Sequence, residues 1–278
     1  MNFRYQIALY IGNITGYLIN KISKYTSLYV PFKYKLLERL FSPQITKLSF
    51  NKKNYIIKFN ALSEKGFWRM KCINKKHKKL NYLISKLTKD DIFWDVGANI
   101  GQISLFAGLV SEAYTYSFEI EPFTFSMLVD NVNKNNLNKS ITTLPIGLGK
   151  QNNLQPIFID NDPYTNSARN CLYDKNIYED NLPKLIVMKG DDVLEKFNCK
   201  LPTFLKIDVD GPELDVLIGM KKILSNEKLK NIVVECILSG DSENYKPIKE
   251  YLSKFNFKEN YEFSNSKSNI QNIHFIRI

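Results

Sequence analysis

From about residue 90 onward, apolar residues form short runs that alternate with stretches of helical periodicity. The first run, residues 92–96, leads into a turn of small residues, and an apolar helix begins near Gly101. Two further runs, 114–118 and 204–207, are each followed at once by acidic residues. Strands that alternate with helices are typical of βαβ units and a parallel sheet. The pattern therefore predicts an α/β fold whose ligands bind at the carboxyl ends of the strands.

The residues before position 88 follow other patterns. The elements that we expect there are an amphipathic helix at 5–24, a second helix at 32–41, a β-hairpin of strands 45–50 and 55–59 around the turn 51–54, and a helix at 80–87. We therefore predict two parts, an N-terminal extension over residues 1–88 and an α/β domain over residues 89–278.

The turn after the first strand has the composition of a cofactor site. It has the form D-x-G-x-N-x-G, with Asp95, Gly97, Asn99 and Gly101 at the fixed positions. Glycine lets the backbone approach a ligand closely, and the start of the helix supplies free N–H donors. Glu119 follows the second strand, about 20 residues after the turn, which is where an acidic residue meets ribose hydroxyls in doubly wound folds. A cofactor that contains ribose is expected.

The spacing of the small residues decides between two cofactor classes. A dinucleotide fingerprint needs glycine at three positions of G-x-G-x-x-G, and Asn99 and Gln102 stand at two of them. The turn instead resembles motif I of S-adenosylmethionine-dependent methyltransferases, whose ligand carries an ammonium and a carboxylate but no phosphate. The alternative is an α/β domain with an empty crevice. The resemblance implies that S-adenosylmethionine is bound by Asp95, Gly97, Asn99, Gly101 and Glu119.

A second acidic motif follows the strand at 204–207. Residues 206–213 read K-I-D-V-D-G-P-E, which resembles the strand-end signature K-I-D-V-E-G-x-E of the FkbM family of methyltransferases. The resemblance spans about residues 90–237, and it includes the strand at 232–235. It implies a Rossmann-like class I methyltransferase with a mostly parallel seven-stranded sheet and helices on both faces. Within it, Glu119 matches the family's ribose-binding acid.

The chain departs from the family pattern at three places. Asp210 stands where the family usually has glutamate, and Pro212 stands where it usually has a small residue. Residues 74–77 read N-K-K-H, where many relatives carry an aromatic and acidic pair. The reach of the carboxylates into the site and the outer part of the cofactor pocket are therefore not carried over from the family.

Transfer of a methyl group to an alcohol requires removal of the hydroxyl proton, and the second motif supplies carboxylates for this step. We expect Asp208 or Asp210 to act as general base or to position the acceptor, with Glu213 as a supporting polar residue and Lys206 orienting the carboxylates. The alternative is structural, since Asp210 could cap the following helix and Glu213 could complement its N-terminus.

The family resemblance implies O-methylation of a sugar or glycan, in surface-polysaccharide or secondary-metabolite assembly. The net charge of +11 raises the alternative of an RNA methyltransferase with a Lys-rich surface. Arginine, on which base readout usually relies, occurs at only five positions, so a nucleic-acid partner is not favoured. A non-catalytic scaffold that keeps the fold to bind a partner is a further alternative. The oligomeric state stays open.

Metal and disulfide sites are not indicated by the cysteines and histidines. The four cysteines lack C-x-x-C spacing, and the two histidines, His77 and His274, are far apart in sequence. Asp191 and Asp192, together with the strand-end carboxylates, could provide an oxygen-only Mg²⁺ site. The commoner role of such a pair is a helix start, and the family resemblance implies independence of metal. We therefore predict no metal.

The sequence predicts a cytoplasmic protein. No run approaches the about 18 apolar residues of a membrane-spanning helix, and the N-terminal segment lacks a usual cleavage site. The basic amphipathic helix at 5–24 is compatible with peripheral contact to the inner face of the membrane. The alternative is a helical cap packed on the domain.

Overall fold

In a computed structural model of the chain, the described residues are 44–60, 66, 70–71, 73, 78–156, 182–261 and 268–278. Residues Gln44–Ile278 belong to one compact unit, and the predicted boundary between residues 88 and 89 stays a prediction. Outside the described residues lie the predicted helices at 5–24 and 32–41, the segment 74–77, Cys72 and Cys171. None of the helices within the described ranges combines the length and the apolar character that a bilayer crossing requires.

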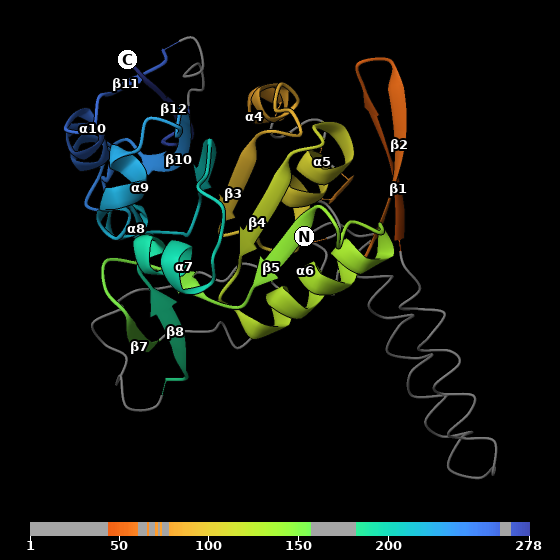
Figure 1. Cartoon of the computed structure of the whole chain (residues 1–278), viewed down its shortest axis with the longest axis horizontal. Coiled ribbons are helices and arrows are strands. Elements are labelled where there is room, and N and C mark those ends of the chain that lie inside the picture. Colours follow the sequence, from red (N-terminus) through yellow and green to blue (C-terminus); the bar gives the residue numbers. More distant parts are fainter. Residues whose placement is uncertain are drawn as a thin grey trace, which may run out of the picture. The chain divides into compact units, whose positions relative to one another are not determined.

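A seven-stranded mixed sheet forms the centre of the fold, as predicted, in the order β11-β12-β10-β9-β3-β4-β5 (Figure 1). The parallel strands are β3 Ile92–Val96, β4 Tyr114–Phe118, β5 Ile141–Leu144, β9 Phe204–Ile207 and β10 Asn231–Ile237. Two antiparallel strands, β12 Ile270–Arg277 and β11 Phe257–Glu259, complete one edge. The order brings β3 and β9 side by side, although they are more than a hundred residues apart in sequence.

Helices cover both faces of this sheet, as the family resemblance implies. The helices are α4 Lys78–Ile84, α5 Gln102–Val110, α6 Pro122–Lys134, α7 Gly190–Lys196, α8 Glu213–Ile218, α9 Lys221–Ser225 and α10 Tyr245–Ser253. Phe93 packs in one apolar cluster with α4, α5 and α6, whereas the adjacent Trp94 packs in the other with α7 to α10. Successive side chains of a strand point to opposite faces, so β3 contributes to both cores.

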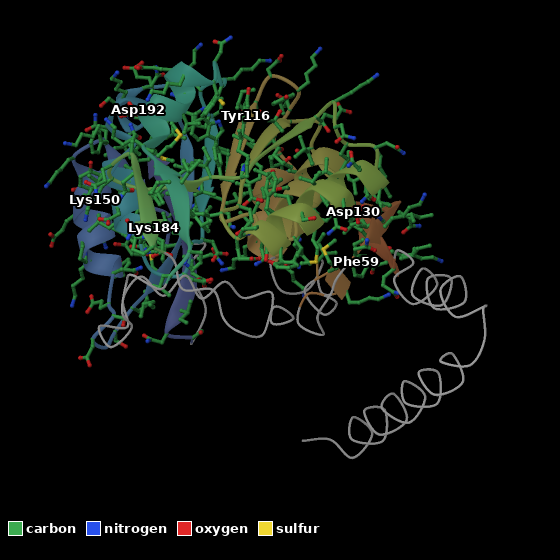
Figure 2. The ribbon with its side chains drawn as sticks, turned by 90° about the horizontal axis from the view of Figure 1, so that it is seen from below. Phe59, Tyr116, Asp130, Lys150, Lys184 and Asp192 are labelled. Atoms are coloured by element: carbon green, nitrogen blue, oxygen red, sulfur yellow. The ribbon has the colours of Figure 1, made fainter. Side chains whose placement is uncertain are left out.

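The predicted hairpin is present as β1 Gln44–Phe50 and β2 Lys53–Phe59. Its turn is shorter than the predicted segment 51–54, because Asn51 and Lys52 take left-handed conformations (φ 47° and 63°), which suit a two-residue hairpin turn. Hydrogen bonds fix the hairpin to α6: the Lys58 amide donates to the Asn135 side chain at 3.0 Å, and the Asn60 amide to Asn131 at 2.6 Å. Figure 2 shows the end of the hairpin at Phe59 near Asp130 of α6.

A smaller three-stranded sheet lies outside the central one. It consists of β6 Gly147–Leu148, β7 Asn153–Pro156 and β8 Lys184–Met188, in the order β6-β8-β7. Leu154 and Ile186 are direct cross-strand partners on its surface, and they are 61% and 51% exposed. Residues 157–181, which belong to the connection between β7 and β8, lie outside the described part of the chain.

Candidate functional site

The predicted site residues follow neighbouring strands of the central sheet. The glycine turn follows β3, Glu119 follows β4, and residues 208–213 follow β9. Because these strands are parallel and adjacent, their carboxyl ends meet at one edge of the sheet. The sheet topology thus brings the two motifs recognised in the sequence into one place.

The glycine turn, residues 97–101, is in backbone contact with residues 208–213, which we call the acidic loop. Gly97, Asn99 and Gly101 all have positive φ values, 76°, 53° and 93°. A β-carbon on residue 97 would lie 1.8 Å from the carbonyl oxygen of Asp208, which is far inside van der Waals contact. Glycine is therefore required at position 97 by the packing of one loop against the other. Close approach of a ligand to Gly97, the role expected from the sequence, stays a prediction.

Glu119 is buried and joins the glycine turn to the start of α6. Its Oε2 accepts a hydrogen bond from the Asn99 amide at 2.8 Å, and its Oε1 accepts one from the Glu121 amide at 2.9 Å. Burial raises the pKa of Glu119 to about 7, although both hydrogen bonds act to lower it. Each carboxylate oxygen has two lone pairs, so Glu119 retains acceptor capacity for two further donors such as hydroxyl groups.

Lys206 connects the glycine turn to the acidic loop. It is buried on β9 directly opposite Asp95 of β3, and its ammonium lies 3.1 Å from Asp95 Oδ1, 2.9 Å from the Gly97 carbonyl oxygen and 3.5 Å from Asp208 Oδ2. Burial would lower the pKa of Lys206, but the carboxylates of Asp95 and Asp208 outweigh it and raise the pKa above its ordinary value. The lysine is therefore charged, and it positions the Asp208 carboxylate.

Asp95 lies on β3, just before the glycine turn, and is fully buried. Besides its ion pair with Lys206, it accepts a hydrogen bond from Ser104 Oγ at 2.6 Å, and Ser117 Oγ donates in turn to Ser104 at 2.8 Å. Both carboxylate oxygens thus already have partners within the protein. Direct contact between Asp95 and a cofactor stays a prediction, and the ion pair with Lys206 is what the structure establishes for this residue.

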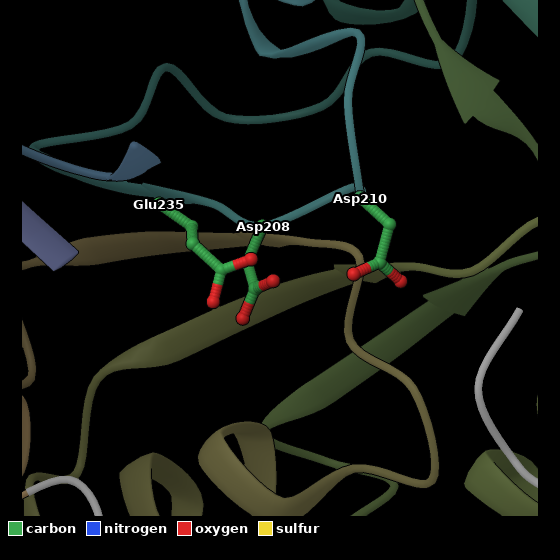
Figure 3. Close-up of side chains that lie close together, drawn as sticks. All are labelled: Asp208, Asp210 and Glu235. Carbon is green, nitrogen blue, oxygen red and sulfur yellow. The ribbon is translucent and has the colours of Figure 1, made fainter. Parts of the chain in front are cut away.

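Three carboxylates converge beyond Lys206, from the loop after β9 and from β10 (Figure 3). One oxygen each of Asp208, Asp210 and Glu235 lies within 4.8 Å of the others. Burial, together with the neighbouring Asp208 and Asp210 carboxylates, raises the pKa of Glu235 to about 8. Carboxylates grouped in this way can accept a proton or contact a cation.

Glu235 was not among the predicted site residues, although it belongs to the segment that resembles the family. The signal that could have found it is the order of the strands. Val234 of β10 pairs with Ile207, the last residue of β9, so Glu235 lies level with Asp208, the first residue after β9. Strand order cannot be read from apolar periodicity alone, and for this reason Glu235 was missed.

Glu213 holds the backbone of the acidic loop through hydrogen bonds. It is buried, and its Oε1 accepts hydrogen bonds from the amides of Gly211 at 3.0 Å and Val209 at 3.3 Å. Its Oε2 accepts a hydrogen bond from the Asn244 side chain at 2.9 Å, and burial raises the pKa of Glu213 above its ordinary value. These contacts fit the predicted role of a supporting polar residue, because they hold the backbone that carries Asp208 and Asp210.

Asp191 and Asp192 serve local structure at the start of α7, the commoner role considered for such a pair. The Asp191 carboxylate accepts hydrogen bonds from the amides of Lys222 and Ile223, at 2.9 and 3.0 Å, and so caps α9. Asp192 is bound by the side chains of Asn152 and Lys189. Each carboxylate of this pair is thus engaged by neighbouring groups of the protein.

Comparison with known proteins identifies related chains. A model of the FkbM methyltransferase domain matches residues 95–259. The hexuronic acid methyltransferase AglP of Haloferax volcanii is 25% identical over 194 residues, which are 70% of this chain and 74% of AglP. The matched residues 95–259 contain the glycine turn, Glu119, the acidic loop and Glu235.

Two solved structures are similar at low sequence identity. The FkbM methyltransferase of Methylobacillus flagellatus has a TM-score of 0.48 and 15% identity, and the match covers 69% of this chain and 47% of that one. This chain thus corresponds to about half the length of that protein. The M. capricolum protein TrmK, solved with S-adenosyl-homocysteine, has a TM-score of 0.43 and 12% identity, with 71% and 67% of the two chains covered.

Proposed function

Because this chain belongs to the FkbM family of S-adenosylmethionine-dependent methyltransferases, we propose that it transfers the methyl group to a hydroxyl of a sugar or glycan. The observation that carries the proposal is the convergence of Asp208, Asp210 and Glu235 beside the glycine turn, because an alcohol needs a proton acceptor. The sugar class is supported by the relative AglP, a hexuronic acid methyltransferase.

The residues at the crevice fit the cofactor. Glu119 offers acceptor lone pairs to the two ribose hydroxyls, and the turn 97–101 lies beside it. The carboxylates of Asp95, Asp208 and Asp210 outnumber the one ammonium of Lys206 that lies among them. This excess of negative charge favours a cationic ligand. When bound, S-adenosylmethionine supplies a methyl group already activated on a sulfonium. We assign cofactor contacts to Glu119, Asn99 and the backbone at Gly97 and Gly101.

The protein's own task is to position the acceptor oxygen and to take its proton. Asp208 is partly exposed at the crevice, and its carboxylate is oriented by Lys206. We assign Asp208 as the group that accepts the hydroxyl proton, and the more exposed Asp210 as a group that positions the acceptor. Glu213 keeps the loop that carries both carboxylates in shape.

The first test concerns the cofactor contact of Glu119. In Glu119→Gln, we expect the affinity for S-adenosylmethionine, measured by calorimetry, to fall about ten-fold or more, because charge-assisted hydrogen bonds to the ribose are lost. The wild-type affinity should rise with pH through about 7, as the buried carboxyl ionises and becomes a better acceptor. The variant should lack this pH dependence.

The exposed Glu112→Gln is the matched control for this titration, and it should bind like the wild type. Equal affinity of Glu119→Gln and the wild type at pH 6 and pH 8 would rule out the ribose contact. A separate effect concerns stability without cofactor. Since folding raises the pKa of Glu119 from 4.5, its contribution to the free energy of unfolding should decrease as pH rises from about 4.5 to about 7.

The second test concerns the acceptor and the bond that is formed. We expect transfer of labelled methyl from S-adenosylmethionine to glycans that present free hydroxyls, and we expect the product to resist mild alkali, since an ether resists it whereas a methyl ester releases methanol. A uronic acid and its carboxyl-reduced counterpart form the matched pair of acceptors. Label that alkali releases would contradict hydroxyl methylation, and preferential labelling of RNA would contradict the sugar class.

A further inference from the structure

The hairpin β1–β2 has one face packed on the domain and one face exposed. Leu48, Ile57 and Phe59 point inward and are fully buried in the apolar cluster with α5 and α6. The opposite side, which we call the hairpin face, consists of Ile45, Lys47, Ser49, Asn54, Ile56 and Lys58. Ile45 and Ile56 on this face are 55% and 60% exposed. Two branched apolar side chains therefore remain in contact with water on a rigidly held element.

The hairpin face combines these isoleucines with positive charge. In the strand register, Ile45 lies opposite Lys58 and Lys47 lies opposite Ile56, so apolar and cationic side chains alternate across the face. Lys52 and Lys53 add two further charges at the turn. Residues 44–60 include four lysines and no aspartate or glutamate. The face is thus apolar and cationic at once, with no acidic residue of its own strands to neutralise it.

We propose that the hairpin face docks on the surface of a membrane that contains anionic lipids. Lysines near such a surface are attracted by its negative potential, and apolar side chains between them bury themselves at the boundary of headgroups and acyl chains. Hydrogen bonds between the backbone of Lys58 and Asn60 and the side chains of Asn135 and Asn131 hold the hairpin against α6, so the face is presented on an ordered element. This inference does not depend on the proposed acceptor.

Other occupants fit the hairpin face less well. Single-stranded nucleic acid is bound by stacking of bases on aromatic rings, and the six residues of the face include neither an aromatic side chain nor an arginine. A second copy of the chain would bring two lysine-bearing faces together, and like charges in close contact repel. An anionic lipid surface complements both the charge and the isoleucines.

Flotation of the full-length protein with lipid vesicles tests the proposal. We expect binding to vesicles of phosphatidylcholine with phosphatidylglycerol, weakening with salt, and little binding to phosphatidylcholine alone. The double variants Ile45→Ser with Ile56→Ser, and Lys47→Gln with Lys58→Gln, should each weaken binding about ten-fold or more. Both change exposed side chains only, so the inward packing and the cofactor affinity should be retained.

The matched control is Leu154→Ser with Ile186→Ser, an equally exposed cross-strand pair on the small sheet, which should bind vesicles like the wild type. Equal flotation of all the proteins would overturn the proposal, as would absence of flotation of the wild type. It would also be overturned if the hairpin variants lost affinity for an RNA oligonucleotide or lost self-association in gel filtration while vesicle binding was unchanged.

Discussion

Replacing Gly97 with alanine is expected to weaken S-adenosylmethionine binding by about a hundred-fold or more. The added β-carbon would lie 1.8 Å from the carbonyl oxygen of Asp208, and the φ of 76° is itself unfavourable, by about 1–2 kcal/mol, for a residue with a side chain. Relief of the clash requires the glycine turn and the acidic loop to separate. Calorimetric titration with the cofactor, together with the temperature of thermal unfolding, measures both consequences.

Gly240→Ala separates backbone strain from the clash between the loops. Gly240 has a comparable φ of 97°, and a β-carbon there would meet nothing within 4 Å. This control should lose a small amount of stability and keep its cofactor affinity. Wild-type affinity in Gly97→Ala would mean that close packing of the two loops is not needed to form the cofactor site.

The change Asp208→Asn is expected to lower turnover with a hydroxyl acceptor by about two to four orders of magnitude, the usual contribution of a general base. The amide keeps the shape of the side chain but cannot take up the hydroxyl proton. Cofactor affinity should change far less than turnover, because Lys206 retains its ion pair with Asp95. Single-turnover kinetics at saturating cofactor separates the two effects.

Asp215→Asn on α8 is the matched control for this measurement, because Asp215 forms a surface ion pair with Lys150, a type of pair that contributes little. Asp210→Asn, measured in parallel, distinguishes the proton acceptor from a group that positions the acceptor. Near-normal turnover of both Asp208→Asn and Asp210→Asn with intact cofactor binding would refute the acid–base assignment. An acceptor carboxylate, which has no proton to lose, would produce that result.

Local parts of the fold could be predicted well from the sequence. The strand at 92–96, the turn after it and the hairpin depend on residues that are neighbours in the chain, so periodicity and turn-forming residues indicate them directly. The predicted helix at 80–87 is observed at Lys78–Ile84. The seven-stranded sheet was predicted from family resemblance, because pairing between distant strands leaves no periodic signal.

Long-range contacts within the site could not be predicted in the same way. The sequence provided Asp95, Lys206 and Asp208 as candidates, but the ion pairs that join them depend on the register of β3 against β9. The place of Glu235 depends likewise on the order of β9 and β10. The family match favours a methyltransferase over the non-catalytic scaffold that the sequence left open. Cofactor and acceptor contacts of individual residues remain predictions.

The position of Lys206 has a consequence for engineering of acceptor specificity. Its one ammonium bridges the strand-end carboxylate of β3, the first glycine of the turn and the acidic loop. A chimera that exchanged only the loop after β9 would place a foreign loop beside a lysine that is matched to Asp208. A chimera that also exchanged β9, for a strand without this lysine, would bury Asp95 without a counter-charge. The smallest segment that can be transplanted is therefore the loop together with β9 and the partner aspartate on β3.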